Sequence, residues 1–380
     1  MPLSKETLQA LSTLKFSTLT PIQAQILPHT LAGQDAIGQA QTGTGKTAAF
    51  LITVIEALLK RPFLSTEQRF LAEPRALILA PTRELAQQIF ADCRELVRFS
   101  RLHALCMTGG ADFDHQEMQL YKQPLDILIG TPGRIIDWAK RGELFLDRIE
   151  LLVLDEADRM LDMGFIPAVK YLIGKMPANT HRQSLLFSAT FNPDVMHLAY
   201  RWLYQPSFVE ITPERKTNQD IEQRFYLLAE KEKLTALKTL LQQDDVKKAI
   251  VFANRKDQVK RLYDNLRRYV DVSMLSGDVA QQKRERYLQR FKDGVVKVLV
   301  ATDVAGRGIH VDDVSHVINF NLPELPDDYV HRIGRTGRAG QQGISISFVS
   351  ENDAFNLPAL EKHLGASLKL QQFDAPVSER

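Results

Sequence analysis

Short aliphatic runs recur along both halves of the chain, and they restrict the possible folds more than any other feature. In the first half the runs are 76–80, 127–130, 151–154 and 184–187. Apart from Ser184 the runs contain no polar side chain, which is typical of strands buried on both faces of a parallel sheet. The segments between the runs are long enough for crossover helices. One of these segments, 83–99, brings four apolar residues near one helical stripe: Leu85, Ile89, Leu96 and Phe99.

The second half repeats this alternation. Its runs are 249–253, 298–301, 316–320 and 344–349, with helical segments such as 256–268 between them. The sequence therefore predicts two tandem α/β domains, each a mostly parallel sheet flanked by helices. The polar stretch 211–220 is the predicted linker, so the domains are expected at 1–210 and 221–380.

Composition excludes several classes of protein. Of 380 residues, 44% are hydrophobic and 25% charged, which argues against a largely disordered chain. The longest mostly apolar stretch, 48–59, is interrupted by Thr53 and Glu56 and is too short to span a membrane. The first ten residues lack the apolar core of a signal peptide, and two cysteines imply no disulfide framework. We therefore expect a cytoplasmic protein without a membrane association.

Bulk charge gives only a weak indication of the partner. Residues 1–210 contain 21 Lys/Arg and 22 Asp/Glu, and residues 211–380 contain 27 and 24. The net charges are thus −1 and +3. A nucleic-acid partner would have to be bound by locally placed cations rather than by a field of the whole protein.

Residues 40–47 read AQTGTGKT and resemble a phosphate-binding loop, G-x-x-x-x-G-K-[ST], with Ala40 in place of the first glycine. Lys46 would reach the β- and γ-phosphates of a nucleotide, and the Thr47 hydroxyl would bind Mg²⁺. The helix predicted at 48–59 would point its amino end at the phosphates. A glycine- and threonine-rich turn before a helix is the structural alternative. The candidate nucleotide-binding residues are Gln41, Thr42, Gly43, Thr44, Gly45, Lys46 and Thr47.

Residues 155–158 read DEAD and directly follow a predicted buried strand. A carboxylate at this place would help to organise Mg²⁺, so Asp155 is the candidate metal ligand. Glu156 would orient or deprotonate the attacking water. An acidic helix start, favoured by the helix dipole, is the alternative.

Residues 331–338 read HRIGRTGR and contain three arginines and a histidine. Arg335 and Arg338 are spaced so that two guanidinium groups could converge on one anion. Such arginine fingers stabilise charge on a transferring phosphoryl group. Because these residues lie in the other half of the chain from Lys46, catalysis would require the two halves to close on ATP. A patch that binds RNA phosphates is the alternative.

The ordered set of motifs resembles the DEAD-box family of ATP-dependent RNA helicases, a part of superfamily 2. In chain order the motifs are AQTGTGKT, PTREL at 81–85, TPGR at 131–134, DEAD, SAT at 188–190 and HRIGRTGR. The resemblance extends from about residue 16 to residue 343. It implies two RecA-like domains, ATP and Mg²⁺ as cofactors, and catalysis by Lys46, Asp155, Glu156, Arg335 and Arg338.

The resemblance also implies further site residues. Gln23 would hydrogen-bond the adenine edge and Phe16 would stack on the ring, although either could be a structural residue. Ser188, Thr190 and His331 would couple the ATP state to strand separation, with a structural turn at 188–190 as the alternative. The residues implied to contact RNA are Pro81, Thr82, Arg83, Gly109, Gly110, Thr131, Gly133, Arg134, Asn254, Arg255, Arg284 and Thr302. Their hydroxyl, backbone and guanidinium groups suit phosphate and 2′-hydroxyl contacts, so binding is expected to be largely independent of sequence.

Three positions depart from the family pattern. Lys15 stands where glycine is usual and Leu19 where proline is usual, and 307–310 read RGIH, so His310 replaces an aspartate expected near the ribose. Within the family, the chain is most similar to the helicases of the bacterial RNA degradosome, on the residues at 276–281, 307–310 and 345–365. That similarity implies docking on an endoribonuclease scaffold.

The sequence therefore predicts an RNA-dependent ATPase that locally unwinds RNA duplexes, acting in RNA degradation or in the remodelling of RNA–protein complexes. An ATP-gated RNA clamp that serves a partner nuclease would carry the same motifs and remains open. A DNA translocase is a third possibility, against which the adenine and DEAD motifs argue. Nothing in the sequence suggests an obligate dimer, so a monomer is expected.

Overall fold

The computed structural model describes residues 3–40, 43–61, 71–211, 221–306, 311, 313–337 and 342–373. The chain divides into two compact units, Met1–Pro213 and Glu214–Arg380. Each unit contains one parallel seven-stranded sheet. Except for Ile211, the predicted linker lies outside the described residues.

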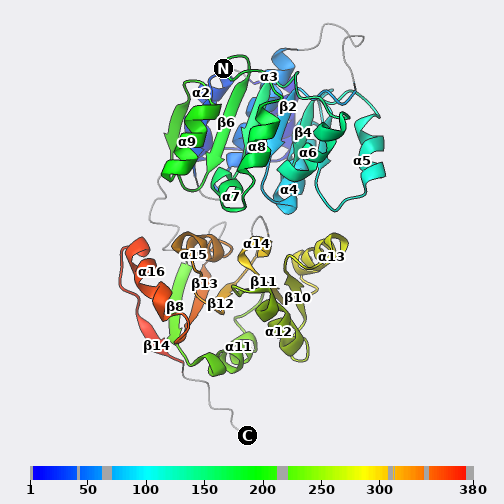
Figure 1. The fold of residues 1–380 in the computed structure, drawn as a ribbon. Coiled ribbons are helices and arrows are strands. Elements are labelled where there is room, and N and C mark those ends of the chain that lie inside the picture. Colours follow the sequence, from blue (N-terminus) through cyan, green and yellow to red (C-terminus); the bar gives the residue numbers. More distant parts are fainter. Residues whose placement is uncertain are drawn as a thin grey trace. The chain divides into compact units, whose positions relative to one another are not determined.

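Unit 1 has helices on both faces of its sheet (Figure 1). Its strands are β1 Ala36–Gln39, β2 Ala76–Leu79, β3 Ala104–Met107, β4 Ile127–Gly130, β5 Leu151–Leu154, β6 Gln183–Ser188 and β7 Ser207–Glu210. Its helices are α1 Lys5–Thr13, α2 Pro21–Leu31, α3 Lys46–Lys60, α4 Arg83–Val97, α5 Phe113–Leu120, α6 Pro132–Arg141, α7 Ala157–Asp162, α8 Ile166–Ile173 and α9 Pro193–Trp202. Successive residues of β2 belong to two different cores, Leu77 and Leu79 to one and Ile78 to the other, as expected for a strand buried on both faces.

Unit 2 has the same architecture. Its strands are β8 Ile221–Leu227, β9 Ala249–Phe252, β10 Val272–Leu275, β11 Val298–Ala301, β12 His316–Asn319, β13 Gly343–Val349 and β14 Leu370–Gln372. Its α-helices are α11 Lys233–Leu241, α12 Lys256–Leu266, α13 Gln281–Lys292, α14 Asp303–Gly306, α15 Pro326–Ile333 and α16 Leu357–Leu364, with short 3₁₀ turns at Glu230–Glu232 and Ala354–Asn356. One face of this sheet packs on α11 and α12, and the other on α13, α15 and α16.

Every predicted strand is present, with ends that differ by at most one residue. Of the three predicted helices, the one at 48–59 is contained in α3, and those at 83–99 and 256–268 end earlier, at Val97 and Leu266. Phe99 therefore lies beyond its helix and packs against the core from a turn. Six strands were not predicted, namely β1, β3, β7, β8, β10 and β14. Four of these six are the edge strands of the two sheets.

The strand order of unit 1, β3-β4-β2-β5-β6-β1-β7, decides which loops become neighbours. Because all strands are parallel, every loop that leaves a carboxyl end emerges at the same edge of the sheet. The loops after β5, β6 and β1 carry DEAD, SAT and AQTGTGKT. The loops after β3, β4 and β2 carry the candidate RNA residues. Ligands of open α/β sheets bind at this edge.

In the part of the chain that the structure describes, no helix is both long and apolar enough to cross a membrane.

Candidate active site and nucleic-acid interface

The phosphate-loop motif follows β1 and leads into α3, whose first residue is Lys46. Gly45 has a φ of +93°, and a Cβ there would lie 2.6 Å from Gln23 Nε2 and 2.7 Å from Thr20 Oγ1. Only glycine combines that backbone geometry with such a close approach. Lys46 is buried, Thr47 is half-buried, and Thr44 and Gly43 precede them in the turn. Gln41 and Thr42 lie outside the described residues.

Gln23 is buried at the start of α2 and connects two segments of the nucleotide site. Its Oε1 accepts a hydrogen bond from the Thr20 backbone N–H at 2.9 Å, and its Nε2 donates to the Gly45 carbonyl at 3.1 Å. The bond from the Thr20 N–H is the Gln23 half of a capping box. Gln23 therefore holds the phosphate loop through its carboxamide, and an adenine contact would have to share or replace these bonds.

Phe16 is 45% exposed, so it is not a core residue and its ring is available on the surface. Its position is set by the end of α1. The Phe16 N–H donates to the Leu11 carbonyl and the Lys15 N–H donates to the Ser12 carbonyl. These two bonds form a Schellman motif. The position that Lys15 occupies in this motif has a left-handed backbone conformation and is usually glycine. Lys15 has a φ of +58°, which explains why glycine is favoured there.

Replacing Lys15 by Gly is expected to raise the free energy of unfolding of unit 1 by about 1 kcal/mol, because a side chain in the left-handed region costs roughly 1–2 kcal/mol. Urea unfolding of the purified protein would measure it. Lys15→Ala is the control, since alanine keeps the Cβ and hence the steric cost. An equal gain in both variants would contradict this explanation.

Asp155 and Glu156 directly follow the carboxyl end of β5. Asp155 is almost fully buried, and its Oδ1 accepts the Glu156 backbone N–H at 2.9 Å. Glu156 has a φ of +51°, a left-handed conformation that is uncommon for such a residue and clusters at functional sites. Burial raises the pKa of Asp155 to about 6, while the nearby Lys46 ammonium lowers it and the Glu156 carboxylate raises it. The buried carboxylates thus lie where additional positive charge would be stabilised.

The donor set fits Mg²⁺ that arrives with ATP. Asp155 offers a carboxylate and Thr47 a hydroxyl, which are hard oxygen ligands. Among the described residues, no three His, Cys, Asp or Glu side chains are arranged to hold a metal by themselves. Mg²⁺ commonly binds one or two carboxylates together with water and substrate phosphates. The oxygens of Asp155 and Thr47 are therefore a sufficient set of protein ligands.

The SAT residues contact the DEAD residues through a compact hydrogen-bond network. The Thr190 N–H and Oγ1 both donate to Asp158 Oδ2 at 3.0 Å. Ser188 Oγ accepts the Asp158 N–H at 3.2 Å and donates to the Thr190 carbonyl at 2.8 Å. The two motifs are therefore joined through Asp158, a residue that the motif contained but that sequence reasoning did not single out.

In unit 1, three candidate RNA segments meet at the ends of β2, β3 and β4. A Cβ on Gly109 would lie 3.2 Å from Arg83 Nη2, so this guanidinium lies against the half-buried Gly109, which precedes the exposed Gly110. Arg134 donates to Gln116 Oε1 at 3.2 Å and to the Ala111 carbonyl at 3.3 Å. Burial lowers the pKa of Arg134, Asp137 opposes this, and the nearby Arg83 and Arg141 lower it further.

The remaining candidate RNA residues of unit 1 lie shortly after β2 and β4. Gly133 is exposed, with open space where a Cβ would stand, while Pro81, Thr82 and Thr131 are buried. The Thr82 hydroxyl accepts the Leu85 N–H and caps α4. Thr131 is the N-cap residue of α6 without a side-chain cap bond, which leaves its hydroxyl uncommitted to the helix. Backbone amides at glycines and helix starts are suited to phosphate oxygens.

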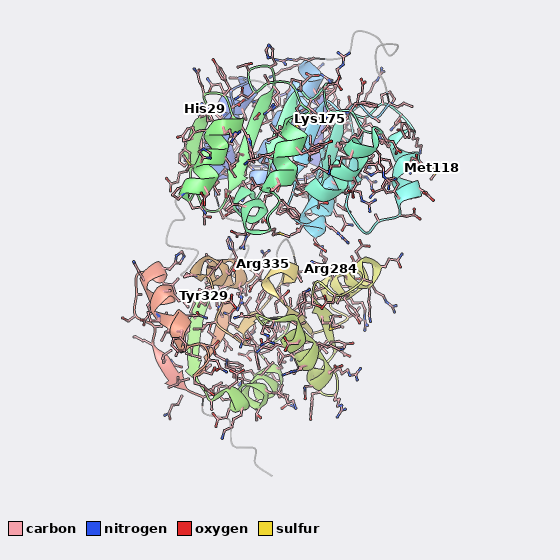
Figure 2. All side chains as sticks on the ribbon, viewed as in Figure 1. His29, Met118, Lys175, Arg284, Tyr329 and Arg335 are labelled. Atoms are coloured by element: carbon pink, nitrogen blue, oxygen red, sulfur yellow. The ribbon has the colours of Figure 1, made fainter. Side chains whose placement is uncertain are left out.

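In unit 2, the candidate RNA residues follow β9, β10 and β11, which are neighbours in the order β10-β11-β9-β12-β13-β8-β14. Arg255 is 73% exposed and pairs with Asp257. Arg284, labelled on α13 in Figure 2, donates to the Ala305 carbonyl at 3.0 Å. Thr302 is buried and its Oγ1 accepts the Ala305 N–H at 3.4 Å. Asn254 bonds inward, with Nδ2 donating to the Leu322 carbonyl at 2.9 Å.

Arg332 is the residue of HRIGRTGR that sequence reasoning missed. It is buried, and its guanidinium uses all five N–H donors. Nε and Nη2 bind the two carboxylate oxygens of Asp303 at 2.5 and 2.6 Å. The other three bonds reach Asn254 Oδ1 at 2.7 Å, the Asn321 carbonyl at 2.7 Å and Asn319 Oδ1 at 3.3 Å. Arg332 therefore positions Asn254 and the start of α14. Its place in an arginine-rich motif was the only available signal.

The other residues of this motif are placed separately. His331 is half-buried on α15. Arg335 is buried and lines a cavity of about 650 Å³ together with Lys248, Asp313 and His316. Arg338 and His310 lie outside the described residues, so the predicted convergence of two arginines and the effect of the histidine substitution stay predictions.

Comparison with known proteins agrees with this geometry. A family model described as DEAD/DEAH box helicase matches residues 20–198, and one described as helicase conserved C-terminal domain matches residues 232–340. The chain is 52% identical to the ATP-dependent RNA helicase RhlB of Pseudomonas syringae pv. tomato, over 97% of this chain and 93% of the relative. The RhlB of Pseudomonas putida is 54% identical over 97% and 92%. The chain belongs to the DEAD-box family of ATP-dependent RNA helicases. It is most similar to the RhlB type, as the sequence predicted.

Solved DEAD-box helicases share the fold. Dbp5 of S. cerevisiae bound to RNA and ADP BeF3 superposes with a TM-score of 0.83 at 32% identity, over 98% of this chain and 94% of that chain. Mss116 bound to ssRNA and UDP-BeF gives a TM-score of 0.87 at 29% identity, over 99% and 79%. The predicted tandem RecA-like architecture is therefore confirmed. As a DEAD-box helicase, the protein is an RNA-dependent ATPase.

Proposed function

We propose that this DEAD-box helicase binds ATP at the ends of β1, β5 and β6, holds one RNA strand on the loops after β2, β3 and β4, and separates duplexes when unit 2 closes on both. The proposal rests mainly on the strand order of unit 1. The nucleotide motifs follow the adjacent strands β5, β6 and β1, and the RNA motifs follow β3, β4 and β2 beside them. The order in unit 2 repeats the grouping of RNA motifs, on β10, β11 and β9.

The proposed roles at the nucleotide follow from the chemistry of each group. Lys46 holds the β- and γ-phosphates, and Glu156 orients the attacking water. Mg²⁺, held by Asp155 and Thr47, would offset phosphate charge when it is bound with ATP. Arg335 and Arg338 stabilise charge on the γ-phosphate after closure. The remaining proposed nucleotide contacts are Phe16, Gln23, Gln41, Thr42, Gly43, Thr44 and Gly45.

The proposed closure would bring together candidate residues that the chain divides between the two units. ATP and RNA each gain contacts only when the units meet, so both ligands favour the closed state. RNA would be held mainly through phosphates and 2′-hydroxyls, which makes binding largely independent of sequence. Hydrolysis and phosphate release remove the contacts of Arg335 and Arg338 and reopen the protein.

We further propose that the protein acts as a monomer in the cytoplasm and serves RNA degradation, docked on an endoribonuclease scaffold. The support is its similarity to helicases named RhlB, over nearly the full chain. Pull-down of the purified protein with candidate endoribonucleases would test the docking. Gel filtration with light scattering would test the monomer.

The proposal is tested by steady-state ATP hydrolysis with duplex RNA, with matched duplex DNA, and without nucleic acid. We expect stimulation by RNA alone, together with ATP-dependent release of the shorter RNA strand. RNA-stimulated hydrolysis without strand release, combined with slow RNA dissociation in ATP, would instead identify an ATP-gated clamp. Equal stimulation by DNA would contradict the proposal.

Replacing both Ser188 and Thr190 by Ala is expected to reduce strand release at least tenfold while RNA-stimulated hydrolysis changes less than threefold, because the network to Asp158 loses its two hydroxyls. A strand-displacement assay beside an ATPase assay would measure both. The Thr180→Ala variant, at an exposed hydroxyl of the same unit, is the control. A parallel loss of both activities would refute a coupling role.

A further inference from the structure

The region from 255 to 292 carries an excess of basic residues that the RNA motifs do not account for. It contains 11 Lys/Arg and 5 Asp/Glu, a net charge of +6. The rest of 211–380 contains 16 Lys/Arg and 19 Asp/Glu, a net charge of −3. Unit 2 is therefore strongly polarised, although its total charge is small. Concentrated positive charge on one region is the electrostatic signature of a polyanion-binding surface.

Helical spacing collects these cations into two stripes. Lys256, Lys260, Tyr263 and Arg267 recur at the i, i+4, i+7 and i+11 positions of α12 and just past its end, and we call them the α12 stripe. Lys283, Arg286, Tyr287 and Arg290 occupy the i, i+3, i+4 and i+7 positions of α13 and form the α13 stripe. Residues with these spacings lie on one helical face. The core-facing side of α12 is formed by Val259, Leu262 and Leu266 instead.

The two stripes meet at the open edge of the sheet. β10 is the terminal strand, with α12 packed in the core on one face of the sheet and α13 in the core on the other. The rings of Tyr263 and Tyr287 lie 6.4 Å apart, so the helices approach each other beside β10. Figure 1 shows α12 and α13 at the same side of unit 2. The stripes therefore form one continuous surface around the edge strand.

Most cations of the stripes are available to a ligand. In the described part of the chain, Lys260, Arg286 and Arg290 form no ion pair, and Lys283 lies 5.5 Å from the centre of the Tyr287 ring. Lys256 pairs with Asp278 and Arg267 with Asp264, but all four side chains are substantially exposed. Such surface pairs are worth about 0–1 kcal/mol and exchange readily for a phosphate.

The α13 stripe begins next to a candidate RNA residue. Arg284 lies between Lys283 and Arg286 in sequence and reaches the loop that contains Thr302 and Ala305. Lys283, Arg286 and Arg290 follow one another by about one helical turn, a rise of about 5.4 Å, so they form a row of charges along the helix. A strand held at Arg284 could thus continue along Lys283, Arg286 and Arg290. An acidic protein segment would not explain this continuity.

We propose that the α12 and α13 stripes form an accessory RNA-binding surface. This surface binds the backbone phosphates of RNA that flanks the strand bound by the candidate RNA residues. This inference rests on the RNA-binding role proposed above. The surface would anchor long RNA without reading its sequence, since it offers cations and no arrangement of base-reading groups. Charged side chains also discourage pairing of an exposed edge strand, and that simpler purpose is the competing explanation.

The test compares two RNAs on three proteins. The short RNA has about 6 nucleotides, enough for the motif loops. The long RNA contains the same core extended on both sides. The test variant is Lys283→Gln/Arg286→Gln/Arg290→Gln. The control is Lys231→Gln/Lys362→Gln/Lys369→Gln, which removes the same charge from exposed sites away from β10 in the same unit. Glutamine keeps helix propensity close to that of Lys and Arg.

The test variant should bind long RNA roughly tenfold or more weakly, and the slope of log K against log salt should fall by about 2, since each lost phosphate contact contributes about 0.7 on a single strand. Short-RNA affinity and ATP hydrolysis without RNA should be unchanged. The control variant should bind both RNAs like the parent.

Three outcomes would overturn the proposal. If the test variant bound long RNA as tightly as the parent, the stripes would not bind RNA. They would instead prevent pairing at the edge strand β10 or bind an acidic protein partner. An equal loss of long-RNA affinity in the control variant would show that the effect comes from the net charge of the protein rather than from the stripes. A loss on short RNA of the same size would assign these residues to the main strand site. Failure of the parent to bind either RNA would instead refute the proposed function.

Discussion

Glu156→Gln is expected to lower RNA-stimulated ATP hydrolysis by about 10²–10⁴-fold, the range for removing a general base. The amide has nearly the same shape as the carboxylate, so the left-handed turn at Glu156 and the hydrogen bond from its N–H to Asp155 are retained. What is lost is the negative oxygen that, in the role proposed for Glu156, orients the attacking water and accepts a proton from it. ATP and RNA binding should persist, because Lys46 and the RNA loops are unaffected.

Single-turnover hydrolysis measures this effect, and nucleotide affinity measured in parallel shows whether binding is retained. Asp162→Asn is the matched control, since it removes one negative charge at the end of α7, on an exposed side chain 3.9 Å from Arg159. It should change the rate less than threefold. If Glu156→Gln reduced nucleotide affinity as much as the rate, Glu156 would be a binding residue rather than the group that activates water.

Arg332→Ala is expected to lower the free energy of unfolding of unit 2 by about 3–5 kcal/mol, the range for removing one partner of a buried ion pair. Arg332 is about 1% exposed and binds both carboxylate oxygens of Asp303. Its removal leaves that carboxylate, Asn254 Oδ1 and the Asn321 carbonyl without their shared donor. Lysine cannot restore the arrangement, because an ammonium lacks the planar fork that reaches four residues.

Urea unfolding followed by a probe in unit 2 would measure this loss. Arg261→Ala is the control, because Arg261 is 79% exposed and lies 3.8 Å from Asp257 in a surface pair. Its effect should stay within about 0.5 kcal/mol. A loss below about 1 kcal/mol for Arg332→Ala would show that the network rearranges around the missing guanidinium, and Arg332 would then not be the residue that positions Asn254.

The strands that the sequence predicted are those buried on both faces. Leu151–Leu154 and Val298–Ala301 are apolar throughout because helices cover both sides of each. The strands that were missed include β3, β7, β10 and β14, which are edge strands. β14 is exposed at all three positions and β7 buries only Val209 fully, so neither produces a continuous apolar run. Burial, which creates the sequence signal, is incomplete at an edge.

The candidate site residues also fall into two groups, those that a local motif predicts and those whose role depends on distant contacts. Motif spacing predicts roles for Lys46, Asp155 and Glu156 because their chemistry depends on short local sequences. It did not identify Arg332 as the centre of a network, because its partners Asn254 and Asp303 are 78 and 29 residues away. Its assignment of Gln23 and Asn254 to ligands stays a prediction, and the structure adds that both carboxamides also donate hydrogen bonds within the protein.

The amino-acid sequence alone determined the alternation of strands and helices, the membership of the DEAD-box family and the chemical identity of the motifs. These depend on local periodicity and on residues close together in the chain. Only the tertiary structure decided the strand order that brings β5, β6 and β1 beside β3, β4 and β2, the Gln23 bond to the phosphate loop, and the junction of α12 and α13 around β10. The physical reason is that contacts between distant segments are selected by the packing of the whole sheet, which no local pattern of residues records.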